Sequence, residues 1–148
     1  MKKTLSIVLS LLMIVSTFSA LPFSALAETS GDFEYALLDD ETVSITGYSG
    51  DATEVIIPTE IDGCPVTEIG QRAFANCSSL TSVTVPDGVT VIRSAAFMYC
   101  YNLKSVNIPD GVTSIGSNAF QDCGITSITL PNSVTSIYSW AFNGCSRL

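Results

Sequence analysis

Hydrophobic positions recur with a nearly constant period through the C-terminal part of the chain. Aligned with itself, the stretch IGQRAFANCSSLTSVTVPDGVTV at 69–91 matches 92–114, 115–136 and 137–148. Phenylalanines at 74, 97, 120 and 142 set these copies 23, 23 and 22 residues apart. A fixed period of about 20 to 50 residues is typical of a solenoid, whose coils bury each other's apolar faces. We call the four copies the first to fourth coils.

Three groups of apolar positions predict the parts of each coil. A short strand carries Leu80, Val83 and Val85 inward, with counterparts down to Leu130, and a proline then ends it. The extended segment that follows the proline, which we call the return leg, carries a second inward pair. This pair is Val89 and Ile92 at its first occurrence and Val134 and Ile137 at its last. The third group has the spacing of a helical turn. Its predicted core positions are Phe74, Cys77, Phe97, Cys100, Phe120, Cys123, Phe142 and Cys145.

The recurring phrase I-G-x-x-A-F-x-x-C-x-x-L-x-x-V-x-I-P over 69–148 resembles the BspA-like bacterial leucine-rich repeat family, a cell-surface class with a 23-residue unit. The resemblance implies an α/β solenoid: a right-handed leucine-rich-repeat array with parallel strands and short helical turns. It also implies adhesion or recognition rather than catalysis. We assign the repeats to 51–148 and expect the last one to be incomplete, as in a piece of a longer array.

Two segments precede the regular coils. A less regular coil, ATEVIIPTEIDGCPVTEIG, keeps the same phase but carries five extra residues, and Cys64 is expected on that insertion loop. Before it, residues 28–50 alternate as a β-hairpin with the acidic turn Asp39-Asp40-Glu41. A solenoid end exposes apolar core and strand edge, so this acidic hairpin is predicted to be an N-terminal cap. Calcium binding at its turn is the alternative, although the ligand spacing of an EF-hand is missing.

Residues 1–27 have the order of a secretory signal peptide. Lys2 and Lys3 precede a short apolar run, and Ala25-Leu26-Ala27 forms a small-residue cleavage site. A membrane anchor is the competing interpretation, but the run is short for a span of about 20 residues and Pro22 interrupts it. The sequence therefore predicts a secreted, extracellular or cell-surface protein, with no membrane span after cleavage.

Charge excludes two classes of partner. Removing Lys2 and Lys3 with the signal leaves 4 basic and 14 acidic residues, a formal charge of −10. Eleven of the acids lie between Glu28 and Glu68, a range without Lys or Arg. Nucleic acids and anionic membranes need clustered cations, so neither is expected as a partner. The charge is best explained as keeping a secreted protein soluble.

Catalytic and metal chemistry finds little support in the sequence. The chain has no histidine, which removes Cys-His and Ser-His nucleophile pairs. A column with one cysteine per coil does not converge on a tetrahedral zinc ion, and no phosphate-loop or nucleotide motif occurs. We therefore predict no enzyme, cofactor or metal. The cysteine column is expected to hold buried free thiols, although the coil spacing of about 4.8 Å does not forbid a disulfide.

The outward positions of the strands form the candidate ligand-facing surface. Rows of short hydroxyl and amide side chains could hydrogen-bond a glycan or an extended peptide, but they also suit a solvated strand. These residues are Ser82, Thr84, Ser105, Asn107, Ser127 and Thr129. Surface aromatics at Tyr99, Tyr101, Tyr138 and Trp140 are a second candidate, for sugar stacking or protein anchoring, with ordinary scattered aromatics as the alternative. The sequence thus predicts recognition of an extracellular protein or glycan, or else a spacer that presents another module.

Overall fold

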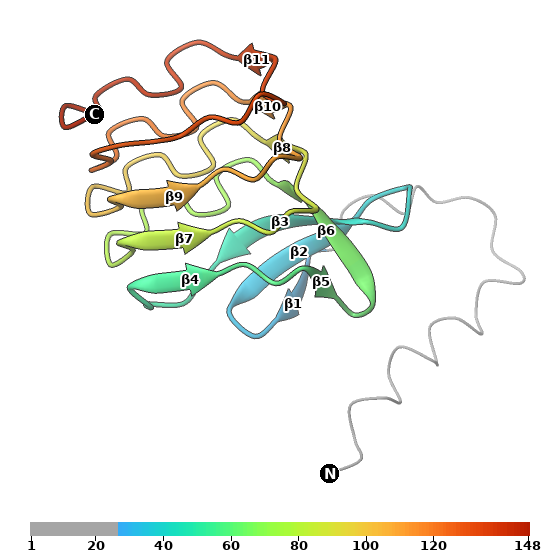
Figure 1. Ribbon diagram of the computed structural model, residues 1–148. Coiled ribbons are helices and arrows are strands. Elements are labelled where there is room, and N and C mark those ends of the chain that lie inside the picture. Colours follow the sequence, from blue (N-terminus) through green and yellow to red (C-terminus); the bar gives the residue numbers. More distant parts are fainter. Residues whose placement is uncertain (1–26) are drawn as a thin grey trace, which may run out of the picture.

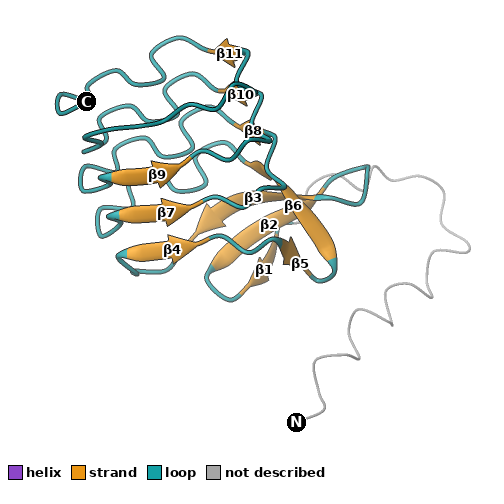
Figure 2. Ribbon diagram, viewed as in Figure 1, coloured by secondary structure: helices purple, strands orange, loops and turns teal. Residues whose placement is uncertain are grey.

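The computed structural model describes residues 27–148, so the predicted signal peptide lies outside the described residues apart from Ala27. Strands are the regular elements of this part (Figures 1 and 2). They are β1 (Glu28–Ser30), β2 (Phe33–Leu37), β3 (Val43–Tyr48), β4 (Glu54–Ile56), β5 (Glu60–Ile61), β6 (Cys64–Ile69), β7 (Ser82–Thr84), β8 (Val91–Ile92), β9 (Ser105–Asn107), β10 (Ser114–Ile115) and β11 (Ser136–Ile137).

The strands form two sheets along the stack of coils. The larger has the order β1-β2-β3-β6-β8-β10-β11, with β5 paired to β6, and every neighbouring pair from β3 to β11 is parallel. The smaller sheet, β4-β7-β9, is also parallel and stands on another side of the stack (Figure 1). This is the arrangement of a parallel β-solenoid, in which the less regular coil and the first and second coils each add one strand to each sheet.

The predicted helical turns, and with them the α/β class, are not confirmed. No helix occurs in residues 27–148, and the third leg of each coil is a run of turns at 71–76, 94–99, 117–122 and 139–144. Backbone φ is positive at every fourth residue of these runs. The positions are Arg72, Asn76, Ala95, Tyr99, Asn118, Asp122, Trp140 and Gly144. A residue with positive φ interrupts a right-handed helix, so Phe and Cys reach the core from linked β-turns.

Hydrogen bonds on the turn leg alternate between local and intercoil partners. The N–H groups of residues 73, 75 and 77 donate to carbonyls three residues back at 3.0–3.3 Å, as in Ala75 N to Arg72 O at 3.0 Å. Those of 72, 74 and 76 donate to carbonyls 94, 96 and 98 of the next coil, with Phe74 N to Ala96 O at 2.8 Å. The alternation gives hydrogen-bond partners both to the N–H groups that point along the coil and to those that point toward the next coil. In a helix, the main-chain groups would bond only within the helix itself.

The positive φ at Arg72 leads to a prediction about the free energy of unfolding. A left-handed backbone costs a side-chain-bearing residue about 1–2 kcal/mol, and glycine avoids that cost but loses about 0.5–1 kcal/mol in chain entropy. We expect Arg72→Gly to raise the free energy of unfolding by about 0.5 kcal/mol, measured by urea denaturation at high salt. Gln71→Gly, at the exposed neighbour without positive φ, should lower it. Equal losses in both variants would contradict the assigned backbone.

The predicted core columns are present, with exceptions in the first, third and fourth coils. Phe74, Phe97 and Phe120 are fully buried, and each ring stacks on the next at 5.1–5.2 Å between centroids. Phe142 continues the stack at 5.3 Å but is half-buried, as Cys77 is. Leu130 and Ile137, predicted to point into the core, are 37% and 50% exposed. Among the described residues, the segment of Ile137 pairs with only one neighbouring coil, and the segment of Leu130 pairs with none.

The N-terminal hairpin continues the solenoid. β2 and β3 pair antiparallel, and β3 then pairs in parallel with β6, so Ile45 stands beside Ile69. The ring of Tyr48 stacks on Phe74 at 5.3 Å, in the position that a phenylalanine occupies in later coils. The hairpin therefore covers the first coil with a matching strand and aromatic ring.

The insertion of the less regular coil is a second hairpin, β5–β6, rather than a loop. Its turn is Asp62-Gly63, both with positive φ, as a two-residue type I′ turn requires. Cys64 begins β6 and is half-buried, which corrects its predicted place on a loop. The Tyr35 hydroxyl lies 2.6 Å from Asp62 and 2.9 Å from Glu28, so it ties this hairpin to β1 and β2. Burial, followed by these carboxylates, raises the pKa of the Tyr35 phenol.

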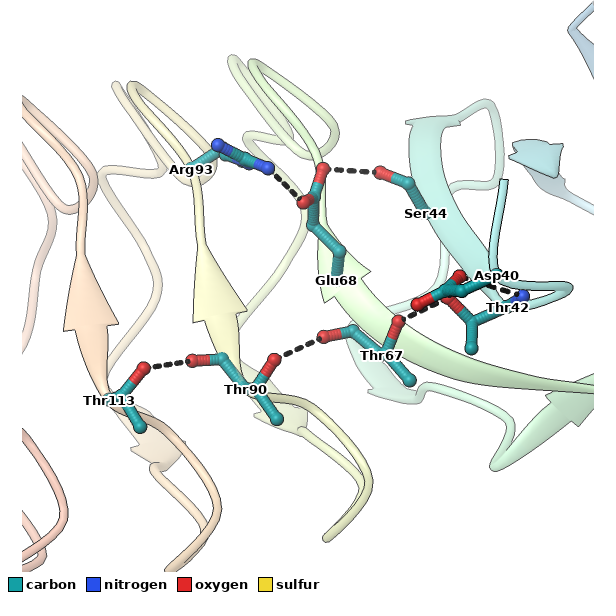
Figure 3. Close-up of polar contacts among 8 residues, drawn as sticks. All are labelled: Asp40, Thr42, Ser44, Thr67, Glu68, Thr90, Arg93 and Thr113. Atoms are coloured by element: carbon teal, nitrogen blue, oxygen red, sulfur yellow. Dashed lines mark hydrogen bonds and ion pairs between the residues drawn. The ribbon is translucent and has the colours of Figure 1, made fainter. Parts of the chain in front are cut away.

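A row of threonines holds the return legs in register (Figure 3). Thr67 donates to the hydroxyl of Thr42 at 2.8 Å, Thr90 donates to the carbonyl of Thr67 at 3.4 Å, and Thr113 to that of Thr90 at 3.2 Å. Glu68, beside this row, accepts from Ser44 at 2.9 Å and pairs with Arg93. The same contacts therefore link the N-terminal hairpin to the coils.

Candidate functional site

The six predicted ligand-facing residues fall into two groups. Ser82 and Thr84 lie on β7 and Ser105 and Asn107 on β9, where the inward neighbours Val83 and Val106 are buried. We call the outward surface of β4, β7 and β9 the strand face. Ser127 and Thr129 are exposed, but their segment is not a strand and does not join this sheet. The predicted continuous row is thus interrupted after β9.

Asn107 is exposed, yet both polar atoms of its amide are engaged. Its Oδ1 accepts from Val85 N at 2.7 Å, and its Nδ2 donates to Val85 O at 3.1 Å. The amide therefore extends the pairing of β7 and β9 by one step, and its predicted role as a ligand-facing group stays a prediction. Its place on the surface remains as predicted.

The smaller sheet stops at β9 because the third coil is one residue short. The first, second and fourth coils have two residues between the column cysteine and the next apolar residue, whereas the third has only Gly124. A Cβ at Gly124 would overlap with the carbonyl oxygen of Tyr101, so this shortcut requires glycine. No hydrogen bond joins residues 126–130 to β9 within the described chain.

A free main-chain edge results on β9. Ile57 N donates to Thr84 O at 3.0 Å, and Val85 N donates to Asn107 Oδ1, so the equivalent amide is paired in two successive coils. The N–H of Ile108 has no acceptor among the described residues, although Ile108 itself is 9% exposed. An amide left without a protein partner at the surface is available to water or to a ligand.

A hollow of about 380 Å³ lies between β9 and the third coil. Val106, Ile108 and Ile128 supply apolar lining, and four of the six predicted residues are also among its lining residues: Ser105, Asn107, Ser127 and Thr129. Its volume falls within the range of about 300–1,000 Å³ that is usual for small ligand sites. The hollow, the free edge and the predicted residues therefore coincide.

The cysteine column makes a second kind of intercoil contact. The five cysteines are free thiols, and Cys100, Cys123 and Cys145 are buried. Each of these three donates its S–H to the carbonyl of the phenylalanine one coil earlier, such as Cys100 to Phe74 at 3.0 Å. The same carbonyl accepts the N–H of Cys77 at 3.3 Å. These three thiols thus bond to main-chain carbonyls inside the stack of coils.

Burial of the thiols predicts loss of stability in alkali. Burial raises the pKa of Cys77 from its ordinary 9.0 to about 11, and it also raises the pKa of Cys145. Because the fold favours the neutral thiol, its contribution is complete below the unfolded pKa and declines as the pH rises through the folded pKa. We expect urea denaturation to show a free energy of unfolding that falls between pH 9 and about 11.

Cys77→Ala should make this fall smaller, and Cys64→Ala, which removes a thiol outside the column, should leave it unchanged. An identical pH profile in all three proteins would contradict the assignment to the column.

The hollow was missed by reasoning from the sequence, although one signal was present. The 22-residue spacing between Phe120 and Phe142 marks the short coil. Residues beside that deletion, such as Val106 and Ile108, looked like ordinary inward positions because their strand pattern is unchanged.

Comparison with protein families identifies the repeat. A family model described as BspA type leucine rich repeat region matches residues 53–148 in 6 copies, which is more than half of the chain. Among solved structures, a leucine-rich repeat protein of T. pallidum is 32% identical, with a TM-score of 0.73 over 83% of this chain and 69% of that one. A search of curated proteins gave no match.

Two Bacteroides structures share the architecture. A leucine-rich repeat protein from Bacteroides capillosus is 26% identical, with a TM-score of 0.59 over 76% of this chain and 97% of that one. Another, from Bacteroides ovatus, is 26% identical, with a TM-score of 0.63 over 85% of this chain and 40% of that one. The descriptions of these proteins name repeats and no enzymatic activity. Residues 27–148 contain no helix with the length and hydrophobicity of a membrane span. The chain belongs to the BspA-type leucine-rich repeat family.

Proposed function

We propose that this chain is a non-catalytic recognition module that acts outside the cell or at its surface and binds an extended peptide of a protein partner beside β9. The free edge of β9 carries the proposal. An added strand would satisfy the N–H of Ile108, which has no acceptor in the described chain, and alternate side chains would enter the hollow. Main-chain bonds of this kind supply affinity, and the lining residues supply selectivity.

Several features support this choice of ligand. The hollow has an apolar part at Val106 and Ile108 and short hydroxyls at Ser105 and Ser127, which suits a strand whose side chains alternate. Repeat solenoids present such surfaces to protein partners. Export is supported by the signal pattern at 1–27. Adhesion would require several weak contacts, because a stable interface needs about 800 Å² per partner.

Selection from a library of linear peptides, followed by titration calorimetry, tests the proposal. A bound peptide should shift the amide resonance of Ile108, and Ser127→Trp, which fills the hollow, should weaken binding by at least about tenfold, or 1.4 kcal/mol. Thr84→Trp places the same bulk on the strand face outside the hollow and should leave affinity within about twofold.

Two results would reject the site. Equal loss in both tryptophan variants would place binding elsewhere on the strand face. Failure of a folded protein to select any peptide would favour the alternative function, a spacer that holds another module away from its anchor.

A further inference from the structure

A second hollow, of about 240 Å³, lies at the corner where the third coil is shortened. We call it the corner notch. It shares no lining residue with the hollow beside β9. Its main lining residues are Tyr101, Asp122, Gly124, Gly144, Ser146 and Arg147. They come from the second, third and fourth coils, so the notch exists only in the assembled stack.

Two glycines keep the notch open. Gly124 occupies alone the place that Tyr101 and Asn102 fill in the second coil and Ser146 and Arg147 fill in the fourth. The missing residue leaves the side chains of the flanking coils without a neighbour between them. At Gly144, a Cβ would overlap with Oδ1 of Asp122, so a larger residue would displace that carboxylate.

Tyr101 gives the notch a supported aromatic ring. Tyr101 is 60% exposed, and its ring stacks on Tyr99, with centroids 6.0 Å apart and planes 23° apart. The adjacent Asn102 donates to the carbonyl of Ser78 at 2.7 Å, which ties the backbone next to Tyr101 to the first coil. A ring held on one side and largely exposed is preorganised for stacking against a ligand.

The polar groups of the notch are complementary in type. Asp122 accepts from Gln121 through Oδ2 at 3.0 Å, while its Oδ1 has no hydrogen-bond donor in the described chain. Arg147 forms no ion pair among residues 27–148. A carboxylate that only accepts and a guanidinium that only donates can together satisfy neighbouring hydroxyl groups, each of which does both. Their opposite charges cancel, which favours a neutral ligand over an anion.

We propose that the corner notch binds a neutral sugar, with the C–H face of one pyranose ring on Tyr101 and its hydroxyl groups on Asp122 and Arg147. Its volume is below the range of about 300–1,000 Å³ for larger small-molecule sites, which limits the contact to about one ring. The site is independent of the proposed peptide site, because the two have no residue in common. Because the contact is shallow, we expect dissociation constants of about 1–10 mM, which correspond to binding free energies of roughly 3–4 kcal/mol.

Methyl glycosides of glucose, galactose and mannose are the probes, with binding measured by saturation-transfer difference NMR and by titration of amide shifts. At least one glycoside should shift the amides of 101, 122 and 147. Tyr101→Ala should abolish the signal, and Asp122→Asn, which keeps the shape but adds a donor, should weaken binding several-fold. Tyr138→Ala removes a similarly exposed tyrosine outside the notch and should retain binding.

Three outcomes would overturn the sugar site. These are no shift with any glycoside at its solubility limit, equal effects of Tyr101→Ala and Tyr138→Ala, or saturation by inorganic phosphate at lower concentration than by any glycoside. A fourth outcome, retention of glycoside binding in folded Asp122→Asn but its loss in Ser127→Trp, would overturn it by assigning the sugar to the other hollow. Near-ultraviolet circular dichroism shows that each variant is folded.

Discussion

Phe97→Ala is expected to lower the free energy of unfolding by about 3–5 kcal/mol. The ring is fully buried and lies between Phe74 at 5.1 Å and Phe120 at 5.2 Å, so its loss leaves a cavity inside the stack and removes two aromatic contacts. A loss of this size is a large part of the about 5–15 kcal/mol that stabilises a typical domain. Urea denaturation followed by circular dichroism measures it.

Phe142→Ala is the matched control for this loss. Phe142 occupies the same column, but it is half-buried and stacks only on Phe120 among the described rings. We expect its removal to cost about 1–2 kcal/mol, because less apolar surface returns to water and one stacked pair is lost. Similar losses at both positions would show that the column does not act as a continuous stack.

Restoring the missing residue of the third coil should complete the smaller sheet. If Gly124 is replaced by the pair Tyr-Asn, which the second coil has at 101–102, the segment that follows gains the length needed to pair with β9. The N–H of Ile108 then gains an acceptor, and its hydrogen exchange should slow by at least about tenfold. Peptide binding beside β9 and sugar binding in the corner notch should both be lost, because both hollows depend on the short coil.

Gly124→Ala separates chain length from the loss of glycine. Its Cβ would overlap with the carbonyl oxygen of Tyr101, and we expect overpacking of about 1–3 kcal/mol without protection of the Ile108 amide. Protection in the alanine variant, or continued rapid exchange in the lengthened coil, would contradict the explanation of the free edge by the deletion.

The repeat columns could be predicted because they follow from apolar burial alone. Phe74 and Cys100 recur at a spacing that only stacked coils can bury, and both are fully buried. The turn leg could not be predicted. Its positive φ falls on Arg72, Ala95 and Trp140, which carry no glycine-like signal, and the phenylalanine–cysteine spacing fits a helical turn as well. Intercoil hydrogen bonds, absent from any single coil, select the turns.

The sequence by itself determined the period, the inward columns and the surface position of the outward residues, because each follows from local alternation and burial. Tertiary structure decided which of those residues bond to a neighbouring coil and which border a hollow. Asn107 is used by Val85 across the coils, whereas Ser105 and Ser127 border a hollow created by one deletion at Gly124. Whether the neighbouring coil already bonds an outward polar group is fixed only when the coils stack.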